Sequence, residues 1–546
     1  MTTLADRLAR FAAGCRDGGL PAEVARDAVG RVRDVLGNCL AAHAEETGDG
    51  PGGPAAAVRH VAAHAEDAGE GAGGPAVRRV AAHAEDAGEG AGGPAVRRVA
   101  AHAEDAGEGS GGPAVRHVAA QAEAAVGGPG GPVAAVRRVV AGWGGTAAAA
   151  AIGLPYGLPA PSAALVNGTL AHALDFDDTH LPSVLHPSAS VVPAALAAAE
   201  DAGAGGAALL AAVAAGDEVC VRLGMASYLP ELRNSLFFEK GLHATSICGT
   251  IGAAVAAGLL YGLDAEGIAS AIGVAASMGA GLLEANRTGG TVKRVHCGWA
   301  AHAGVTAATL AREGLTGPPT VLEGRFGFFA AYLDGRHDAD ALLAGLGERW
   351  EVVRTAYKPY PANHFTHPAI DCALALRARG LDPDDIEEIE LGAPAPALRT
   401  IAEPHEEKIR PRSPYHAKFS GPYTVATALL GGGGLGVYLD DFAELHPRRL
   451  ALAARVRCVA DERASELFPM SFGAVLRVRV RGGATLTHRV DSSRGGPDNP
   501  LSPGELALKF RLNAARALPA REVAALDSRI AALATSPSCA GLARLG

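Results

Sequence analysis

The sequence predicts a mainly α-helical protein, in which a large all-helical domain is interrupted by a smaller α+β lid domain. From about residue 135 to 350, Ala-rich segments of helical periodicity follow one another, with glycine and proline between them. From about residue 352, apolar and polar residues alternate as in strands, in "IEEIELGA", "ARVRCVAD" and "AVLRVRVRGGATLTHRV". After "DNPLSPGEL" the pattern is helical again, so we expect C-terminal helices to complete the first domain.

These changes of pattern divide the chain into five segments. Residues 1–46 and 131–352 form the first two parts of the helical domain, and 496–546 form the third. Residues 353–495 form the α+β lid domain. Residues 47–130 are an Ala- and Gly-rich insertion between the first two helical parts.

The insertion repeats the unit "GGPAVRRVAAHAEDAGEGA" with a period of 19 residues, which places histidines at His64, His83 and His102. Each unit begins a short helix at proline and ends in a glycine-rich break. The units contain too few large apolar residues to build a core. We therefore interpret the insertion as a tolerated surface addition of short helices or disorder, rather than as a His-rich binding array.

Charge and cysteine usage exclude several classes of protein. The net charge of −9 argues against nucleic acid as the main partner, because phosphate binding needs a basic face. An anionic substrate would then need a locally positive pocket. The eight cysteines form no CxxC pair, so the sequence predicts neither a zinc knuckle nor a disulfide framework.

The sequence also predicts a cytoplasmic protein without a membrane partner. The N-terminus, "MTTLADRLARFAAGC", has charges spread through it and no apolar core of a secretion signal. The longest apolar run, "TIGAAVAAGLLYGL", is shorter than the roughly 20 residues that a membrane span needs.

One segment, "LAHALDFDDTHLPSVLHPSAS", is unusually rich in polar side chains that can do chemistry: His172, Asp175, Asp177, Asp178, Thr179, His180 and His186. A helix over 165–179 would place His172, Asp175 and Thr179 on one face. His186 precedes Pro187, a natural first residue of the next helix. The positive end of that helix favours neutral imidazole, so we expect His186 to act as a base.

Three more loop-to-helix junctions carry histidine or lysine. His243 stands before a small-residue helix, and "VKRVH", with Lys293, leads into another. "YKPYPANHFTHP", with Lys358, His364 and His367, precedes a helix near Pro368. Four such junctions in a net-acidic protein predict a pocket for a substrate with several carboxylates.

The sequence does not favour a metal or an organic cofactor. "DFDDTH" resembles the Asp-rich Mg²⁺ motif of helical isoprenoid synthases, but no second metal motif follows and aromatic residues are few. "GGGGLG" at 431–436 lacks the GxGxxG pattern, and no Walker A or GxSxG motif is present. A Mg²⁺-dependent helical synthase and a non-catalytic repeat scaffold are the alternatives from other classes.

Five motifs, in order, resemble the MmgE/PrpD family: "NGTLAHALDFDDTHLPSVLHPSAS", "GLHATSICGTIGAA", "GGTVKRVHCGWAAHAG", "YKPYPANHFTHPAIDCALAL" and "AKFSGPYTVATALL". That family contains 2-methylcitrate dehydratases, cis-aconitate decarboxylases and iminodisuccinate epimerases. The resemblance covers the chain except for about residues 47–130. It implies a helical domain, an α+β lid, a homodimer, no metal or organic cofactor, and an active site between the two domains.

The resemblance also implies the site residues. The catalytic residues would be His186, Asp175, Thr179 and Tyr423, and the substrate-binding residues would be His243, Lys293 and Lys358. His186 would move the proton and Asp175 would support it electrostatically. Tyr423 would donate to a leaving hydroxyl or a carboxylate. The two lysines would stabilise charge that develops next to a carboxylate.

The function expected from the resemblance is that of a cofactor-independent hydro-lyase acting on a citrate-like tricarboxylate. Dehydration of 2-methylcitrate to 2-methylaconitate, in propionate metabolism, is the type reaction. The alternatives are decarboxylation of cis-aconitate and epimerisation of iminodisuccinate.

Deleting three of the 19-residue units should leave folding and turnover nearly intact, because the units lack core-forming side chains. Thermal unfolding and steady-state kinetics check this expectation. A collapse of the melting temperature, or loss of a dimer, would show that the insertion is structural.

Overall fold

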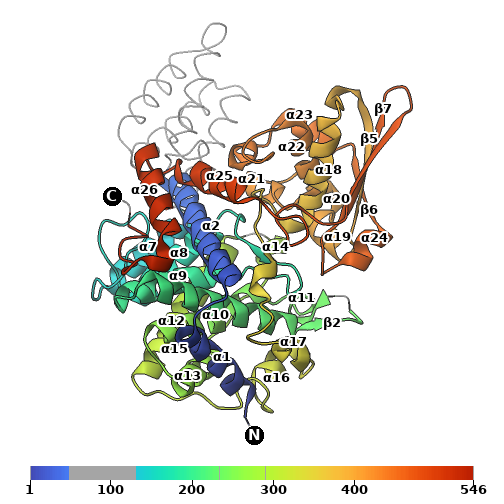
Figure 1. Ribbon diagram of the computed structural model, residues 1–546. Coiled ribbons are helices and arrows are strands. Elements are labelled where there is room, and N and C mark those ends of the chain that lie inside the picture. Colours follow the sequence, from blue (N-terminus) through green and yellow to red (C-terminus); the bar gives the residue numbers. More distant parts are fainter. Residues whose placement is uncertain (1, 48–130, 233, 289, 545–546) are drawn as a thin grey trace, which may run out of the picture.

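A computed structural model describes residues 2–47, 131–232, 234–288 and 290–544, and it confirms the mainly α-helical class (Figure 1). The predicted insertion lies outside the described residues, apart from its first residue. Its repeats therefore stay a sequence-based prediction.

Most long helices pack into one body around a core of small residues. These helices are α1 (Leu4–Gly18), α2 (Ala22–Thr47), α7 (Pro132–Trp143), α8 (Ala160–His172), α9 (Ser188–Asp201), α10 (Gly206–Met225), α12 (Ala244–Leu260), α13 (Ala265–Ala275), α15 (His296–Arg312), α25 (Pro503–Ala514) and α26 (Ala520–Ala531). Every residue of α12 is buried, and α9, α10, α13 and α15 pack around it. Helix α12 is therefore the centre of this body.

Short elements connect these helices. They are α11 (Leu236–Glu239), α14 (Ala285–Thr288), α16 (Phe328–Leu333), α17 (Ala339–Leu343), and the 3₁₀ turns η2 (Val292–Val295), η3 (Val352–Arg354) and η7 (Leu533–Thr535). Two antiparallel ribbons join β1 (Thr179–His180) to β4 (Thr355–Ala356) and β2 (Tyr228–Leu229) to β3 (Asn234–Ser235).

Helices α8 and α15 approach closely because both carry glycine at their contact. A Cβ added to Gly168 would lie 2.8 Å from the Cα atom of Gly298 and 2.9 Å from the carbonyl oxygen of Cys297. Only glycine fits such a backbone-to-backbone contact without a shift of one helix. The Ala- and Gly-rich sequence is therefore used to bring the helices that carry the site residues close together.

The second body contains a four-stranded sheet of order β6-β5-β7-β8, in which β5 pairs parallel with β6 and antiparallel with β7. The strands are β5 (Ile386–Ala393), β6 (Val456–Ala460), β7 (Ala474–Val480) and β8 (Thr485–Val490). The helices and turns around them are η4 (His364–Thr366), α18 (His367–Ala378), η5 (Pro383–Asp385), α19 (Ala395–Ile401), α20 (His405–Ile409), α21 (Pro414–Ala417), α22 (Gly421–Leu430), η6 (Leu439–Phe442), α23 (Pro447–Ala453) and α24 (Glu462–Leu467).

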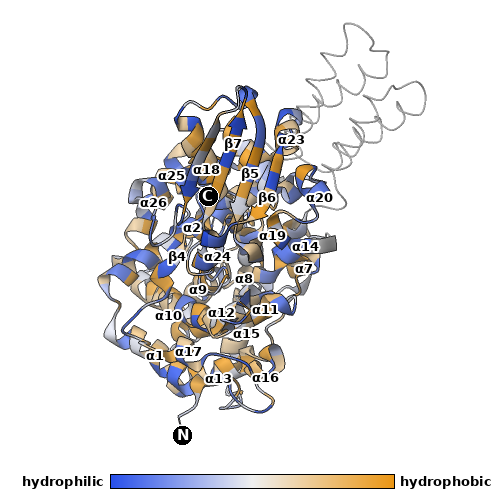
Figure 2. Cartoon of the chain, turned by 90° about the vertical axis from the view of Figure 1, so that its right-hand side faces the viewer, coloured by the Kyte–Doolittle hydropathy of each residue, from blue (hydrophilic) through white to orange (hydrophobic). Residues whose placement is uncertain are grey.

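This sheet is apolar on one face and charged on the other. Ile389 and Leu476 pack with Ile370 of α18 and Val425 of α22 in one core cluster. The alternation expected from the sequence appears along β5 and β7 in Figure 2. On the other face, exposed arginines and glutamates pair across the strands, as between Arg479 and Glu388. The period-2 pattern therefore arises from a sheet covered by helices on one side only.

The C-terminal helices α25 and α26 (red in Figure 1) lie against α2 (blue). Lys509 of α25 forms an ion pair with Asp34 of α2, with 2.7 Å between Nζ and Oδ1. The side-chain amides of Asn513 and Asn38 also bond to each other, at 3.0 Å. The chain therefore returns to its first helices after it has built the sheet. No helix among the described residues is long and apolar enough to cross a membrane.

Replacing Gly168 with alanine should destabilise the protein by roughly 1–3 kcal/mol, because the added methyl group meets backbone atoms of α15. Gly14 is the matched control. It is exposed on α1 and a Cβ there would meet nothing within 4 Å. Gly14→Ala should be neutral or stabilise by up to about 1 kcal/mol. Equal effects of the two substitutions in denaturant unfolding would contradict the close packing of α8 and α15.

Candidate active site

The site is built on the loop that follows α8. The expected helix over 165–179 was wrong, because α8 ends at His172. Asp175 then takes a positive φ of 56°, a conformation that ends a helix and that Asp adopts more readily than most residues. Thr179 lies not on a helical face but in β1, paired with Ala356.

Three buried lysines from distant parts of the chain bind successive carbonyl oxygens of this loop. Each lysine Nζ donates a hydrogen bond to one backbone carbonyl oxygen, and the N–O distances are 2.9 to 3.0 Å. The pairs are Lys418 with Leu174, Lys358 with Asp175, and Lys509 with Phe176. Carbonyls that follow a helix C-terminus have no partners in the helix and carry partial negative charge, so ammonium groups bind them well. The loop is therefore held from the sheet body and from α25 at the same time.

The Asp175 carboxylate lies between two lysines. Its Oδ1 is 3.2 Å from Nζ of Lys293, and its Oδ2 is 3.3 Å from Nζ of Lys358. Burial alone would raise the pKa of Asp175, but Lys358 and Lys293 hold that pKa well below its usual range. Lys358 is fully buried. Two ammonium groups thus share one carboxylate, which leaves positive charge available to a bound anion.

Among the described residues, the hydrogen bonds of the His186 ring involve Nδ1 and not Nε2. Its Nδ1 is 2.5 Å from the carbonyl oxygen of Asp178. Because a carbonyl can only accept, Nδ1 carries the proton and Nε2 has a free lone pair. Burial lowers the pKa of His186 to about 4, opposed by Asp177 and assisted by Lys358. His186 is therefore a neutral imidazole at pH 7, and it lies just before α9 as the sequence predicted.

A row of imidazoles extends from His186. The ring of His172 lies 5.6 Å from that of His186 and 5.7 Å from that of His243, measured between centroids. His243 caps α12, and its Nδ1 is 2.9 Å from Nδ1 of His296. Burial lowers the pKa of His243 well below its usual range and that of His296 to about 4. His243, predicted to bind substrate, thus lies two rings away from His186.

The structure does not bring Tyr423 into this group. Its ring lies in the core of the sheet body, and its hydroxyl donates to the carbonyl of Glu444 and accepts from the backbone N–H of His446, both at 3.2 Å. The expected role as a proton donor therefore finds no support in its position. A different phenol, Tyr415, lies near Lys293. Burial lowers the pKa of Lys293 but Tyr415 raises it, and the guanidinium of Arg294 stacks 4.1 Å above the Tyr415 ring.

Several members of the site were not assigned from the sequence. Lys418 and Lys509 were missed because each binds partners far away in the sequence: both donate to carbonyl oxygens of the loop, and Lys509 also pairs with Asp34. The sequence offered one signal for Lys418: this residue stands in the motif "AKFSGPY", shortly before a helix. Burial lowers its pKa to about 8. His172 and Asp177, 2.7 Å apart between Nδ1 and Oδ2, were noted only as part of a polar segment.

Among the described residues, one group of three side chains has metal-ligating atoms close together: His172, Asp177 and Cys297, within 4.8 Å of one another. Its chemistry does not favour a metal. Nδ1 of His172 is already bonded to Asp177. Burial raises the pKa of the Cys297 thiol well above its usual value, so in the metal-free protein this sulfur is a neutral thiol.

Two buried lysines around one carboxylate, together with a neutral imidazole, are groups that can bind an anion and transfer a proton. Comparison with known proteins identifies the family. The MmgE/PrpD N-terminal domain matches residues 119–340, and the MmgE/PrpD C-terminal domain matches residues 360–533. The chain belongs to the MmgE/PrpD family.

Several curated relatives share one name. The cis-aconitate decarboxylase of Homo sapiens is 32% identical over 401 residues, which cover 71% of this chain and 79% of that protein. The cis-aconitate decarboxylase of Mus musculus is 31% identical over 404 residues, 71% of this chain and 78% of that protein. A cis-aconitate decarboxylase of Aspergillus terreus is 27% identical over 374 residues, 64% of this chain and 74% of that protein.

Asp175→Asn should destabilise the protein by about 3–5 kcal/mol, because it leaves two buried lysines without their carboxylate. The folded-state pKa of Asp175 is depressed, so its contribution is present above the unfolded pKa of about 3.9 and is lost as pH falls towards the folded pKa. The stability difference should thus be constant near neutral pH and shrink in acid.

Asp17→Asn is the control for this substitution. Asp17 lies on α1, is exposed, and forms an ion pair with the neighbouring Arg16. Denaturant unfolding should show a change within about 0.5 kcal/mol for it. If Asp175→Asn is equally mild, the ion cluster does not hold the loop.

Proposed function

We propose that the chain is a lyase that acts on a citrate-like tricarboxylate and needs neither a metal nor an organic cofactor. The observation that carries the proposal is the Asp175 carboxylate shared by Lys293 and Lys358, in the same electrostatic cluster as His186. The names of the relatives support a tricarboxylate as substrate. A homodimer in the cytoplasm, as the family resemblance implies, is part of the same proposal.

The proposed chemistry uses these side chains directly. Breaking a bond next to a carboxylate leaves an electron pair on carbon, which spreads into the carboxylate oxygens. Ammonium groups that are already in place, and shielded from water, stabilise that charge without having to reorganise. Lys293 and Lys358 fulfil both conditions, since they are buried and fixed by Asp175. His186 then transfers the proton that the reaction removes or adds.

Decarboxylation of cis-aconitate is the first reaction to test, because the relatives bear that name. The bond between carbon and the departing carboxylate breaks, its electron pair stays on the substrate, and CO₂ leaves. A proton must then be added to carbon. An anionic substrate beside His186 favours the imidazolium form, so the ring can take up a proton on binding and deliver it.

Dehydration of a 2-methylcitrate-like acid is the second candidate, and one specific observation favours it. His186 is neutral in the free protein, which suits removal of a proton from carbon as the first step. The hydroxide that leaves the neighbouring carbon needs a proton donor. Tyr423 is distant from the site, so Tyr415 is the phenol we propose for this role.

The two reactions are separated by supplying the purified protein with cis-aconitate, 2-methylcitrate and citrate. Products are identified by NMR, and CO₂ is measured. Release of CO₂ from cis-aconitate assigns the decarboxylase, and loss of water from 2-methylcitrate assigns the dehydratase. Turnover should survive exhaustive chelation. Failure to convert any tricarboxylate, or recovery with Mg²⁺ or Fe²⁺ after chelation, would contradict the proposal.

His186→Gln should lower kcat by roughly 10²–10⁴-fold, because glutamine keeps a hydrogen-bonding end but cannot carry protons. Binding of a tricarboxylate inhibitor should change by no more than a few-fold. His180 is an unsuitable control, since it is fully buried and bonded to Ser183. His488 on β8, which contacts Arg379 on the sheet body, serves better. An active His186→Gln variant would require a different base.

A further inference from the structure

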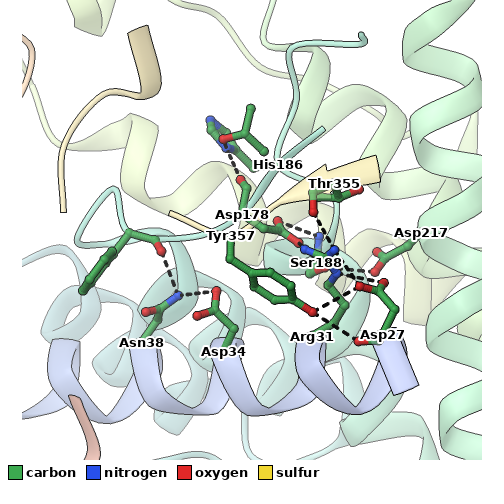
Figure 3. A network of polar contacts seen from close by, with 12 residues as sticks. Asp27, Arg31, Asp34, Asn38, Asp178, His186, Ser188, Asp217, Thr355 and Tyr357 are labelled. Atoms are coloured by element: carbon green, nitrogen blue, oxygen red, sulfur yellow. Dashed lines mark hydrogen bonds and ion pairs between the residues drawn. The ribbon is translucent and has the colours of Figure 1, made fainter. Parts of the chain in front are cut away.

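A buried polar network lies beneath His186, between α2, α9 and α10 (Figure 3). At its centre, Oγ of Ser188 is 2.5 Å from Oδ2 of Asp178 and 2.9 Å from Oδ2 of Asp217. All three residues are at most 2% exposed. The mechanism proposed above uses neither Asp217 nor Ser188, so their burial needs a separate explanation.

The geometry limits where the protons of this network are. A serine hydroxyl has one hydrogen and can donate it to only one of two carboxyl groups. The other carboxyl group must then donate its own proton to Oγ, or the contact joins two acceptors. Of the two, Asp178 has a cationic partner, since Nη1 of Arg31 is 3.2 Å from its Oδ2. Asp178 is therefore the acceptor from Ser188, and Asp217 the donor to it.

The surroundings of Asp217 support the same assignment. The groups that face it are Asp27 and Arg31 from α2, Asp178 from the loop, Ser188 from α9, and Cys220 from its own helix. Arg31 is the one cation among them, and its N–H groups are bonded to Asp27, to Asp178 and to the carbonyl oxygen of Thr355.

The second oxygen of Asp217 also argues for a neutral carboxyl group. Oδ1 is buried and has no hydrogen-bond partner among the described residues. A buried carboxylate with an unpaired oxygen and no free cation is strongly unfavourable, whereas a neutral acid tolerates this position. Burial and the neighbouring Asp178 raise the pKa of Asp217 well above its usual value.

We propose that Asp217 carries a proton at neutral pH and positions the catalytic base through a chain of hydrogen bonds. Asp217 donates to Ser188, and Ser188 donates to the carboxylate of Asp178. The backbone carbonyl of Asp178 accepts from Nδ1 of His186. Asp217 is thus a positioning residue, and this role rests on the proposed function of His186.

The protonation of Asp217 makes a prediction about stability that does not depend on activity. Above the unfolded pKa of about 3.9, the folded protein holds a proton that the unfolded chain releases. Folding must therefore become less favourable as pH rises, by up to tenfold in the unfolding equilibrium constant per pH unit. Asp217→Asn removes this term but keeps a neutral donor for Ser188.

Denaturant unfolding of the full chain between pH 5 and 8 measures the difference between the two proteins. The unfolding constant of the wild type, relative to that of Asp217→Asn, should rise by up to tenfold per pH unit over part of this range. The wild type should also show an infrared band of a protonated carboxyl group that Asp217→Asn lacks. Parallel stability curves, or the absence of that band, would overturn the proposal.

The positioning role is tested by kinetics with the substrate found above. Asp217→Ala should lower kcat about tenfold with little change of KM, since one hydrogen bond of roughly 1.4 kcal/mol is lost. Asp217→Asn should restore kcat, and it should keep kcat at high pH where the wild type declines. Loss of kcat in Asp217→Asn as large as that in Asp217→Ala would overturn this role. Absence of any tricarboxylate turnover would instead defeat the proposed function and leave the stability test intact.

Discussion

The bonds between buried lysines and the loop after α8 are the interaction on which the site depends. Lys358, Lys418 and Lys509 bind three successive carbonyl oxygens, and Asp175 adds its carboxylate to Lys358 and Lys293. Because these lysines come from the sheet body, from α25 and from η2, the loop takes its shape only when the whole chain is folded. A non-glycine residue with positive φ persists only where its surroundings hold it in this way.

The same loop contacts both the lysine pair and His186, the proposed proton-transfer group. Its side chains hold the two lysines that would meet the substrate, and its last residue, Asp178, fixes the tautomer of His186 through a backbone carbonyl. Beneath it, Arg31 and Ser188 hold the Asp178 carboxylate. The lysine pair, the proposed base His186 and the proposed buried acid Asp217 are therefore arranged around five consecutive residues, which accounts for the many polar side chains of this segment.

The sequence predicts those features of the fold and the site that depend on residues close together in the chain. Helical periodicity and period-2 strands gave the class of fold, and proline and small-residue patterns placed His186, His243 and Lys293 at helix starts. The end of α8 was missed because lysines far away in the sequence hold the loop. Tyr423 was misplaced because a motif gives a residue's position in the chain and not the direction of its side chain. The link from Asp217 to Ser188 joins two helices and has no local signal.

We propose that a tricarboxylate binds close to a neutral His186 in the field of Lys293 and Lys358. Calorimetric titration of the protein with tricarballylate, a saturated tricarboxylate, in buffers of different ionisation enthalpy near neutral pH tests this binding mode. Net proton uptake is expected on binding, because the bound anion raises the pKa of His186 from its low value, and His186→Gln should reduce this uptake. Binding without proton uptake, or uptake unchanged in His186→Gln, would contradict it.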